Sequence, residues 1–307
     1  MEDRKNEIIG IDHGWSNMKT VSSVFTSGVK EITTEPALFD NVVEFEGKYY
    51  KVGGKRLEVK DTKVTDENYY ILTLAAIAKE LDRRGQRRAN IFLSVGLPLT
   101  RFGKEKKGFI DYLMKKKELS FKFENVRYSV CIERVSVFPQ CYAAVADRLG
   151  SFKREVVIVD IGSWTVDIMP ILNQKPDEAQ CVTIQQGLIT CMRAINEQCV
   201  RQLGSQVTES DIQEVMMYGR SDIAPKYLEI IQEGIAEFAR SIYFTLKEYG
   251  YNLETIPIVF VGGGATVMKL FGNIQQGNIR YIEDVKANAK GYENLAKIFL
   301  TANKKVG

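Results

Sequence analysis

Two stretches of the chain place an aspartate and a glycine at the end of an apolar run. Residues 8–19 read IIGIDHGWSNMK, and residues 156–168 read VVIVDIGSWTVDI. In both, the apolar run predicts a buried strand, and the tight turn and second apolar run after it predict a returning strand. The backbone N–H groups and hydroxyls of such a turn form a nest for phosphate, and the flanking carboxylates suit a hydrated Mg²⁺.

A third stretch, residues 258–265 with the sequence IVFVGGGA, leads from a predicted strand into three glycines. Only backbone can approach a ligand there, because glycine has no Cβ atom. One Asp-x-Gly turn would be weak evidence, since an aspartate at a strand end is usually a turn former. Two such hairpins about one domain length apart, followed by the glycine strand, indicate a duplicated phosphate-binding unit.

The elements that must position these residues are predicted along the whole chain. Residues 42–54 show two alternating strands around a Glu-Gly turn, and Thr65 and Asp66 are predicted to cap a helix that ends in RRGQRR at 83–88. We expect those arginines to face solvent at a helix C-terminus rather than to form a nucleic-acid patch. Further strands are predicted at 121–132 and 135–140, a small-residue helix at 141–146, and helices at 187–203, 208–218 and 225–249.

Length and composition narrow the class of protein. At 307 residues with 45% hydrophobic content the chain can fill two cores, and a net charge of +3 argues neither for a nucleic-acid coat nor for an acidic tail. The five cysteines lack CxxC spacing and are expected to be reduced core residues, and the single histidine, His13, is expected to face solvent in a turn. The charged start of the chain has no apolar signal region and no apolar run could cross a bilayer, so we expect a soluble, cytoplasmic protein without a membrane partner.

The motifs D-x-G-x-x-x-x-K, D-x-G-x-x-T-x-D and V-G-G-G, in this order, resemble the phosphate 1, phosphate 2 and adenosine motifs of the actin/Hsp70/hexokinase ATPase superfamily. Within it the chain is most similar to the ParM/StbA group of bacterial plasmid-segregation actins. The resemblance implies an α/β, actin-like fold of two similar domains, with mixed sheets flanked by helices around an interdomain nucleotide cleft. Domain I would comprise residues 1–150, with a small outer subdomain at about 33–85 and residues 291–307 returning to it, and domain II residues 151–290. Residues 287–294 match the second linker of the family, before a final helix at 295–302.

The same resemblance assigns ligands to individual residues. Nucleotide phosphates would bind Asp12, Gly14, Ser16, Asn17 and Lys19 of the first hairpin, and Gly162, Ser163, Thr165 and Asp167 of the second. The nucleoside would contact Gly187, Gly262, Gly263 and Gly264, and Asp12 and Asp160 would hold Mg²⁺ through water. For Asp167 the alternative is that it braces the hairpin instead of touching the ligand.

Two residues are predicted to act in catalysis, Asp160 through the metal and Gln140 through water. Gln140 follows Pro139, where the plasmid actins often carry Glu and eukaryotic actin has Gln. A glutamine cannot accept a proton at neutral pH, so its role would be to orient the attacking water, and general-base catalysis is in doubt.

The function implied is an actin-like ATPase that binds and hydrolyses ATP, or alternatively GTP, with Mg²⁺ and assembles into nucleotide-dependent filaments for plasmid DNA segregation. Its partners would be further copies of itself and a centromere-binding adaptor of the ParR type, hence plasmid DNA only indirectly. One alternative is an actin-like cytoskeletal or cell-division protein outside segregation. Another is a small-molecule kinase, for which no substrate-pocket motif is recognisable. A chaperone ATPase is disfavoured by the expectation that no peptide-binding domain follows Gly307.

Overall fold

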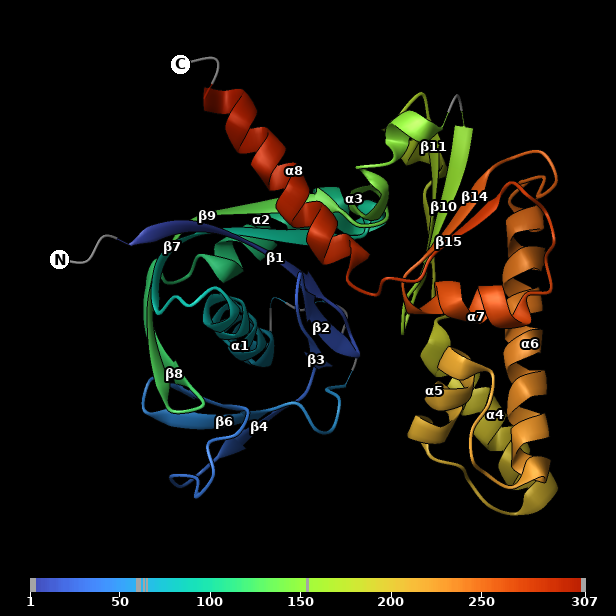
Figure 1. Ribbon diagram of the computed structural model, residues 1–307, viewed down its shortest axis with the longest axis horizontal. Helices are drawn as coiled ribbons and strands as arrows, with labels where there is room; N and C mark the ends of the chain where they lie inside the picture. The colour runs from blue at the N-terminus through green and yellow to red at the C-terminus, as the bar shows by residue number, and fades with distance from the viewer. Residues whose placement is uncertain (1–3, 59–61, 63, 65, 153–154, 305–307) are drawn as a thin grey trace. The chain divides into compact units, whose positions relative to one another are not determined.

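The computed structural model describes residues 4–58, 62, 64, 66–152 and 155–304 (Figure 1). The chain forms two compact units. Unit 1 comprises Met1–Asp147 together with Lys286–Gly307, and unit 2 comprises Arg148–Val285. The limits of these units lie a few residues from the domain limits expected at 150 and 291. Among the helices in the described ranges, none combines the length and the apolar character needed to cross a membrane.

Unit 1 is built on a mixed sheet whose described strands run in the order β3-β2-β1-β7-β9-β8-β5-β6-β4. The central strands β1, β7 and β9 are parallel, and their apolar side chains are buried on both faces. The strand expected at 135–140 is not separate, because β9 continues through it and shifts its register against β7 at Ile91/Phe92. The strands are β1 (Lys5–His13), β2 (Asn17–Thr20), β3 (Val24–Thr26), β4 (Val29–Ile32), β5 (Val42–Phe45), β6 (Lys48–Val52), β7 (Arg88–Leu97), β8 (Glu118–Phe123) and β9 (Val126–Pro139).

The helices of unit 1 are α1 (Glu67–Arg83), α2 (Leu99–Leu113), α3 (Tyr142–Val145) and α8 (Ala287–Lys304). Helix α1 begins after Asp66, whose side chain accepts a hydrogen bond from the backbone N–H of Asn68. The other predicted cap, Thr65, lies outside the described residues. A short 3₁₀ turn, Leu149–Ser151, follows at the start of unit 2.

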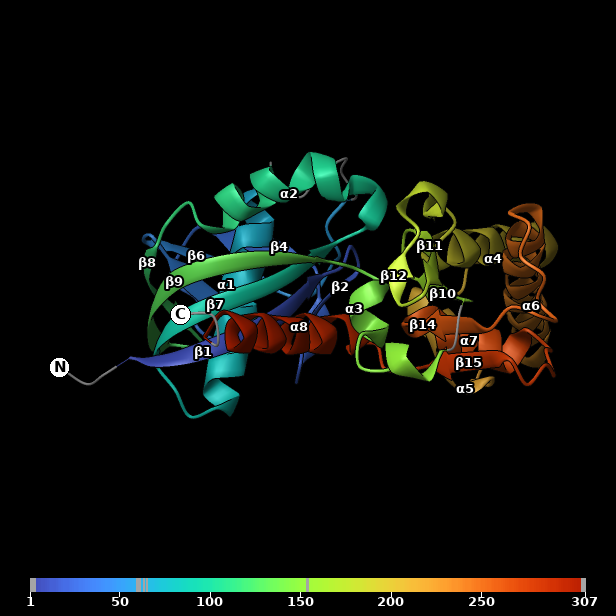
Figure 2. The ribbon, with the colours of Figure 1, turned by 90° about the horizontal axis from the view of Figure 1, so that it is seen from above.

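The linker expected at 287–294 is helical, because α8 begins at Ala287 and lies along the sheet from its first turn (Figures 1 and 2). A Cβ atom on Gly10 of β1 would lie 2.2 Å from the carbonyl oxygen of Ala289, and one on Gly96 of β7 would lie 2.0 Å from the hydroxyl of Tyr292. The two strand glycines therefore make room for the helix. This close packing stabilises helical structure where the local sequence alone indicated a connection.

Unit 2 is built on a second sheet, with strand order β12-β11-β10-β14-β15 and with β13 paired to β11. The three predicted helices at 187–203, 208–218 and 225–249 are confirmed as α4, α5 and α6. Helix α5 begins with a reciprocal capping box between Thr208 and Asp211. The elements are β10 (Glu155–Ile161), β11 (Val166–Leu172), β12 (Lys175–Pro176), the 3₁₀ turn Glu178–Gln180, β13 (Val182–Ile184), α4 (Leu188–Leu203), α5 (Glu209–Tyr218), α6 (Pro225–Glu248), β14 (Ile258–Val261), α7 (Gly263–Phe271) and β15 (Ile279–Ile282).

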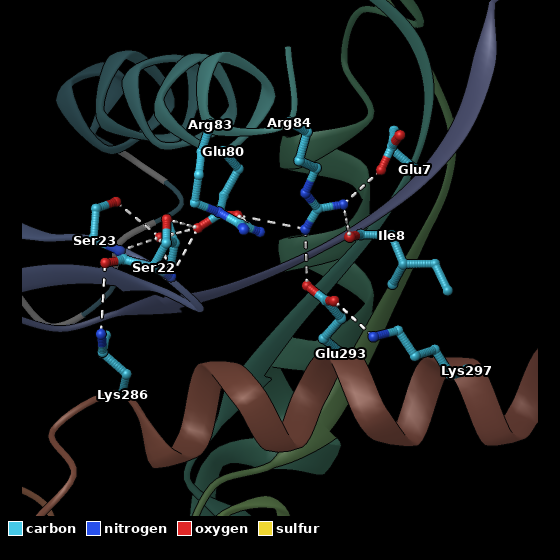
Figure 3. A network of polar contacts seen from close by, with 11 residues as sticks. Glu7, Ile8, Ser22, Ser23, Glu80, Arg83, Arg84, Lys286, Glu293 and Lys297 are labelled. Atoms are coloured by element: carbon cyan, nitrogen blue, oxygen red, sulfur yellow. Dashed lines mark hydrogen bonds and ion pairs between the residues drawn. The ribbon is translucent and has the colours of Figure 1, made fainter. Parts of the chain in front are cut away.

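The arginines at the end of α1 do not all face solvent as expected (Figure 3). The Arg84 guanidinium lies 2.7 Å from the Glu7 carboxylate, 3.1 Å from Glu293 of α8 and 3.4 Å from Glu80, and it also donates to the carbonyl of Ile8. The side chain of Arg84 is only 15% exposed, against 52% for Arg83. Arg84 therefore joins α1, β1 and α8 inside unit 1.

Glu80 is the fully buried acid of this network. Thr20 and Ser22, at the end of β2, each donate a hydroxyl hydrogen bond of 2.5 Å to it, and Ser22 adds its backbone N–H at 2.9 Å. Burial by itself raises the pKa of the Glu80 carboxyl, but the hydrogen bonds from Ser22 and Thr20 outweigh it and hold the pKa below the ordinary 4.5. The charged carboxylate is thus the form that stabilises the fold.

Replacing Arg84 by methionine should lower the free energy of unfolding by about 3 kcal/mol, because the nearly buried carboxylates of Glu80 and Glu293 then keep only half-exposed cations as partners. The matched control, Arg83→Met, removes a half-exposed ion pair with Glu80 and should cost less than about 1 kcal/mol. Urea unfolding of the two variants measures the difference, and equal losses would contradict the prediction.

The same network predicts a pH dependence. Because folding lowers the pKa of Glu80, its contribution to stability is complete above the ordinary pKa of 4.5 and is lost as the pH falls through the lower folded pKa. The difference in stability between the native protein and Arg84→Met should therefore shrink below pH 4.5.

Candidate functional site

The first hairpin brings three of the predicted residues together. Strands β1 and β2 pair so that Asp12 lies opposite Lys19, and the Lys19 Nζ atom is 2.9 Å from the Asp12 carboxylate. Gln140, just after the end of β9, donates from Nε2 to the other oxygen of Asp12 at 3.2 Å. Asp12 is almost fully buried, whereas Lys19 and Gln140 are partly exposed. One carboxylate thus orients a cation and an amide that come from distant parts of the sequence.

The turn of the first hairpin is compact, and Ser27 holds its backbone by hydrogen bonds. A Cβ atom on Gly14 would lie 2.4 Å from the carbonyl oxygen of Asn17, so the turn requires glycine at this position. Ser27 donates its hydroxyl to the carbonyl of Gly14 and its backbone N–H to the carbonyl of Ser16. The hydroxyl of Ser16 is buried and has no hydrogen-bond partner among the described residues. A buried hydroxyl in this state fits a site that accepts a polar ligand.

His13 is not the solvent-facing residue that was expected. It is 2% exposed, its Nε2 atom lies 2.9 Å from the Thr73 hydroxyl of α1, and its ring packs edge-on against Phe109 of α2 at 5.3 Å. Residues 12 and 13 of a strand point to opposite faces. Because β1 is covered by helices on both faces, neither residue reaches open solvent.

The second hairpin has the same backbone pairing and a different charge. Asp160 lies opposite Asp167, the position that Lys19 occupies in the first hairpin. Two carboxylates directly opposite each other destabilise a strand pair unless donors or a cation offset them. Thr165 and Thr183 donate their hydroxyls to the two oxygens of Asp167, at 3.2 and 2.5 Å.

These two contacts support the bracing alternative for Asp167. Thr183 was not predicted as part of the site. It belongs to β13, a strand of three residues that pairs with β11, and so short an alternation carries little signal in the sequence.

The turn of the second hairpin is seated on the N-terminus of α4. The backbone N–H groups of Gly187, Leu188 and Ile189 donate to the carbonyls of Trp164, Gly162 and Ser163, at 3.0, 3.1 and 2.8 Å. These bonds satisfy donors that a helix start otherwise leaves open. A Cβ atom on Gly187 would lie 2.5 Å from the backbone of Trp164, so this contact requires a glycine.

The three glycines after β14 differ in what surrounds them. Gly262 has a φ of +79°, and a Cβ atom there would lie 2.9 Å from the Asp160 carboxylate. A Cβ atom on Gly264 would lie 2.2 Å from the Ile161 side chain, so Gly264 lets α7 pack against β10. At Gly263 a Cβ atom would make only ordinary contacts of 3.9 and 4.0 Å with neighbouring side chains. Packing within unit 2 therefore accounts for Gly264, and Gly263 lies on the more open side.

Each hairpin, taken by itself, offers single carboxylates rather than a cage of metal ligands. In the described part of the chain, no three His, Cys, Asp or Glu side chains are grouped so that they could hold a metal ion. Mg²⁺ keeps several of its waters and is usually bound by one or two carboxylates together with substrate phosphates. Single carboxylates such as Asp12 and Asp160 suit that mode of binding.

The fold and these hairpins define a protein of the actin class, and comparison with known proteins agrees. Residues 10–142 match the family model for the N-terminal domain of actin-like proteins. Residues 158–271 match the family model for the C-terminal domain of the MreB-like archaeal actin homologue. Together the two models span most of the chain. The chain therefore belongs to the actin-like protein family. Among curated proteins, none matches the sequence significantly.

Solved structures show the same fold across nearly the whole chain. A 15-stranded ParM filament from Clostridium botulinum superposes with a TM-score of 0.76 at 19% identity, covering 96% of this chain and 100% of the other. The archaeal actin homologue Ta0583 in complex with ADP gives 0.73 at 19% identity, covering 95% and 99%. ParM of Bacillus thuringiensis with AMPPNP gives 0.71 at 12% identity, covering 95% and 98%. The predicted two-domain, actin-like α/β fold is confirmed.

Proposed function

We propose that this protein is an ATPase that binds ATP with Mg²⁺, or GTP in its place, and assembles into filaments that depend on the nucleotide. The observation that carries the proposal is the convergence of Lys19 and Gln140 on the buried Asp12. It is supported by family membership and by the similar structures, one of which is a ParM filament and two of which hold ADP or AMPPNP.

In this proposal the hairpins bind the phosphates. Lys19 supplies a compact positive charge to a phosphate oxygen, and Ser16 supplies the hydroxyl that has no hydrogen-bond partner among the described residues. Mg²⁺, held through water by Asp12 and Asp160, would neutralise charge on the phosphates. The phosphate-binding turns would comprise Gly14, Ser16, Asn17, Gly162, Ser163 and Thr165, and the nucleoside would contact Gly187, Gly262, Gly263 and Gly264.

Gln140 would orient the attacking water. Its side-chain carbonyl can accept a hydrogen bond from a water while its Nε2 donates to Asp12. Since an amide cannot take up the proton, the rate of hydrolysis should be slow and should depend on geometry more than on pH.

We further propose that the filaments act in plasmid segregation in the cytoplasm, together with an adaptor of the ParR type. The support is the likeness to ParM structures, and an actin-like protein with another cytoskeletal or cell-division role is the alternative. A small-molecule kinase is the second alternative. It would transfer phosphate to an added substrate rather than to water, and it would not sediment with nucleotide.

The proposal is tested by incubating the purified protein with ATP and Mg²⁺ and measuring phosphate release, light scattering and pelleting in the ultracentrifuge. We expect phosphate release and a pellet with ATP, little pellet with ADP, and neither in EDTA. ATP binding with neither phosphate release nor a pellet would favour the kinase alternative, whereas phosphate release without a pellet at any protein concentration would overturn the filament part of the proposal. Absence of both nucleotide binding and phosphate release would overturn the proposed function.

A further inference from the structure

The chain is strained immediately after Gln140. Cys141 has φ 60° and ψ −60°, a conformation that residues with a side chain rarely adopt, and its side chain is buried. The backbone N–H of Tyr142 donates to the carbonyl of Gln140 at 2.6 Å, which closes a three-residue γ-turn centred on Cys141. A γ-turn of this sign is rare and costly, and it persists only where the surrounding structure fixes it.

A side chain of α8 holds this turn. The backbone N–H of Cys141 donates to the Oδ1 atom of Asn288 at 3.2 Å, and Asn288 is only 6% exposed. One turn further along α8, a Cβ atom on Gly291 would lie 2.0 Å from the carbonyl oxygen of Ala143. The glycine brings α8 against α3, so that the Asn288 amide reaches the turn.

The other side of the turn is fixed by the sheet. The backbone N–H of Gln140 donates to the carbonyl of Leu97 in β7 at 2.9 Å, which continues the ladder of β9. The chain then reverses within one residue, and the Gln140 side chain lies against Asp12. Gln140 is thus held between the strand on one side and the strained turn on the other.

We propose that Asn288 is a positioning residue, which accepts the Cys141 N–H, holds the strained turn and so keeps the Gln140 amide in place for the hydrolytic step. The inference rests on the proposed function in that Gln140 orients the attacking water. Without the acceptor, the turn relaxes toward negative φ and Gln140 loses its fixed position. A displacement of about 1 Å at such a group can cost a factor of 100 in rate.

The test compares Asn288→Leu, which removes the acceptor at similar volume, with Asn288→Asp, which keeps an oxygen at the same place. Asn288→Leu should slow ATP hydrolysis about 10- to 100-fold. It should change the affinity for ATP less than about twofold, because the contacts that bind ATP in its ground state do not involve Asn288. Asn288→Asp should stay within about threefold of the native rate, because the hydrogen bond remains. The exposed Asn294→Leu on the same helix is the matched control and should have no effect.

The decisive experiment relieves the backbone strain at Cys141 in the Asn288→Leu variant. Glycine adopts the conformation of Cys141 without a Cβ penalty, so Cys141→Gly combined with Asn288→Leu should recover most of the lost rate. A second readout needs no nucleotide. In protein labelled with ¹⁵N-cysteine, the amide signal that Cys141→Gly removes identifies Cys141, and it should shift in Asn288→Leu and not in Asn294→Leu.

The outcomes separate this inference from the proposed function. A native protein that neither binds nor hydrolyses nucleotide defeats the proposed function, whatever the variants do. A native rate in Asn288→Leu, a loss that Cys141→Gly does not restore, or an unmoved Cys141 amide would overturn the inference alone. If Asn288→Leu does not fold, Asn288→Ala replaces it with the same expectations.

Discussion

Asp160→Ala is expected to reduce ATP hydrolysis at least about 100-fold, because the variant lacks the carboxylate that would hold the waters of Mg²⁺ in unit 2. The opposing acid, Asp167, is already engaged by two threonine hydroxyls and cannot simply take over. The measurement is steady-state phosphate release, combined with the affinity for ATP in Mg²⁺ and in EDTA. In EDTA the affinity should be close to native, whereas the gain on adding Mg²⁺ should be lost.

Two controls make this result specific. Asp160→Asn keeps the volume of the side chain and removes only the charge, so it should show the same loss. Glu178→Ala removes an exposed acid from the same unit and should leave hydrolysis unchanged. Full activity in Asp160→Asn would remove Asp160 from the site, and an equal loss of ATP affinity in EDTA would point to a damaged fold.

Gln140→Ala is expected to slow hydrolysis by one to three orders of magnitude while ATP binding stays nearly native, in line with glutamines that orient the attacking water. Filaments formed by the variant should persist longer, because the nucleotide is hydrolysed more slowly. Phosphate release in a single turnover measures the first effect, and the decay of light scattering after ATP is exhausted measures the second.

A weaker ATP affinity with an unchanged turnover rate would give Gln140 a binding role instead. Loss of the hydrogen bond to Asp12 could also act through Lys19, which shares that carboxylate. Lys19→Met separates the two, since removing the cation that we propose binds a phosphate should weaken ATP binding as well as slow hydrolysis. The control is Gln180→Ala, which replaces an exposed glutamine and should leave both ATP binding and hydrolysis unchanged.

The hairpins could be predicted because each follows from a local pattern. A run of apolar residues, an aspartate and a glycine determine the strand, its end and its turn within about ten residues. The same holds for the helices of unit 2, where apolar residues recur every three or four positions and caps such as Thr208 mark the start. In these segments local preference and tertiary packing agree.

The mistaken expectations concern residues whose surroundings come from distant parts of the chain. His13 looked like a turn residue, but α1 and α2 cover that face of β1. Arg84 looked like one of four surface arginines, but Glu293 of α8 brings a carboxylate to it. Burial of this kind depends on tertiary contacts that periodicity within one segment does not report.

For some residues near the candidate site, the amino-acid sequence contains no pattern that indicates their role. Asn288 lies in a stretch that resembled a linker, and its proposed role rests on the hydrogen bond that it accepts from the backbone N–H of Cys141. Nothing in the residue type of Cys141 predicts a positive φ, which asparagine or glycine would have indicated. Strain is a property of the folded chain and is found only in the structure.

The division of unit 1 into two segments has a consequence for biosynthesis. Arg84 meets Glu293, 209 positions further along the chain, and Gly10 and Gly96 are covered by a helix that begins only at Ala287. While the ribosome is still synthesising unit 2, the sheet of unit 1 therefore lacks α8 and leaves these glycines uncovered. Unit 2 is continuous and can complete its core first. Because the segment that completes unit 1 is synthesised after the whole of unit 2, we expect unit 1 to be completed last during translation, although it contains the N-terminus.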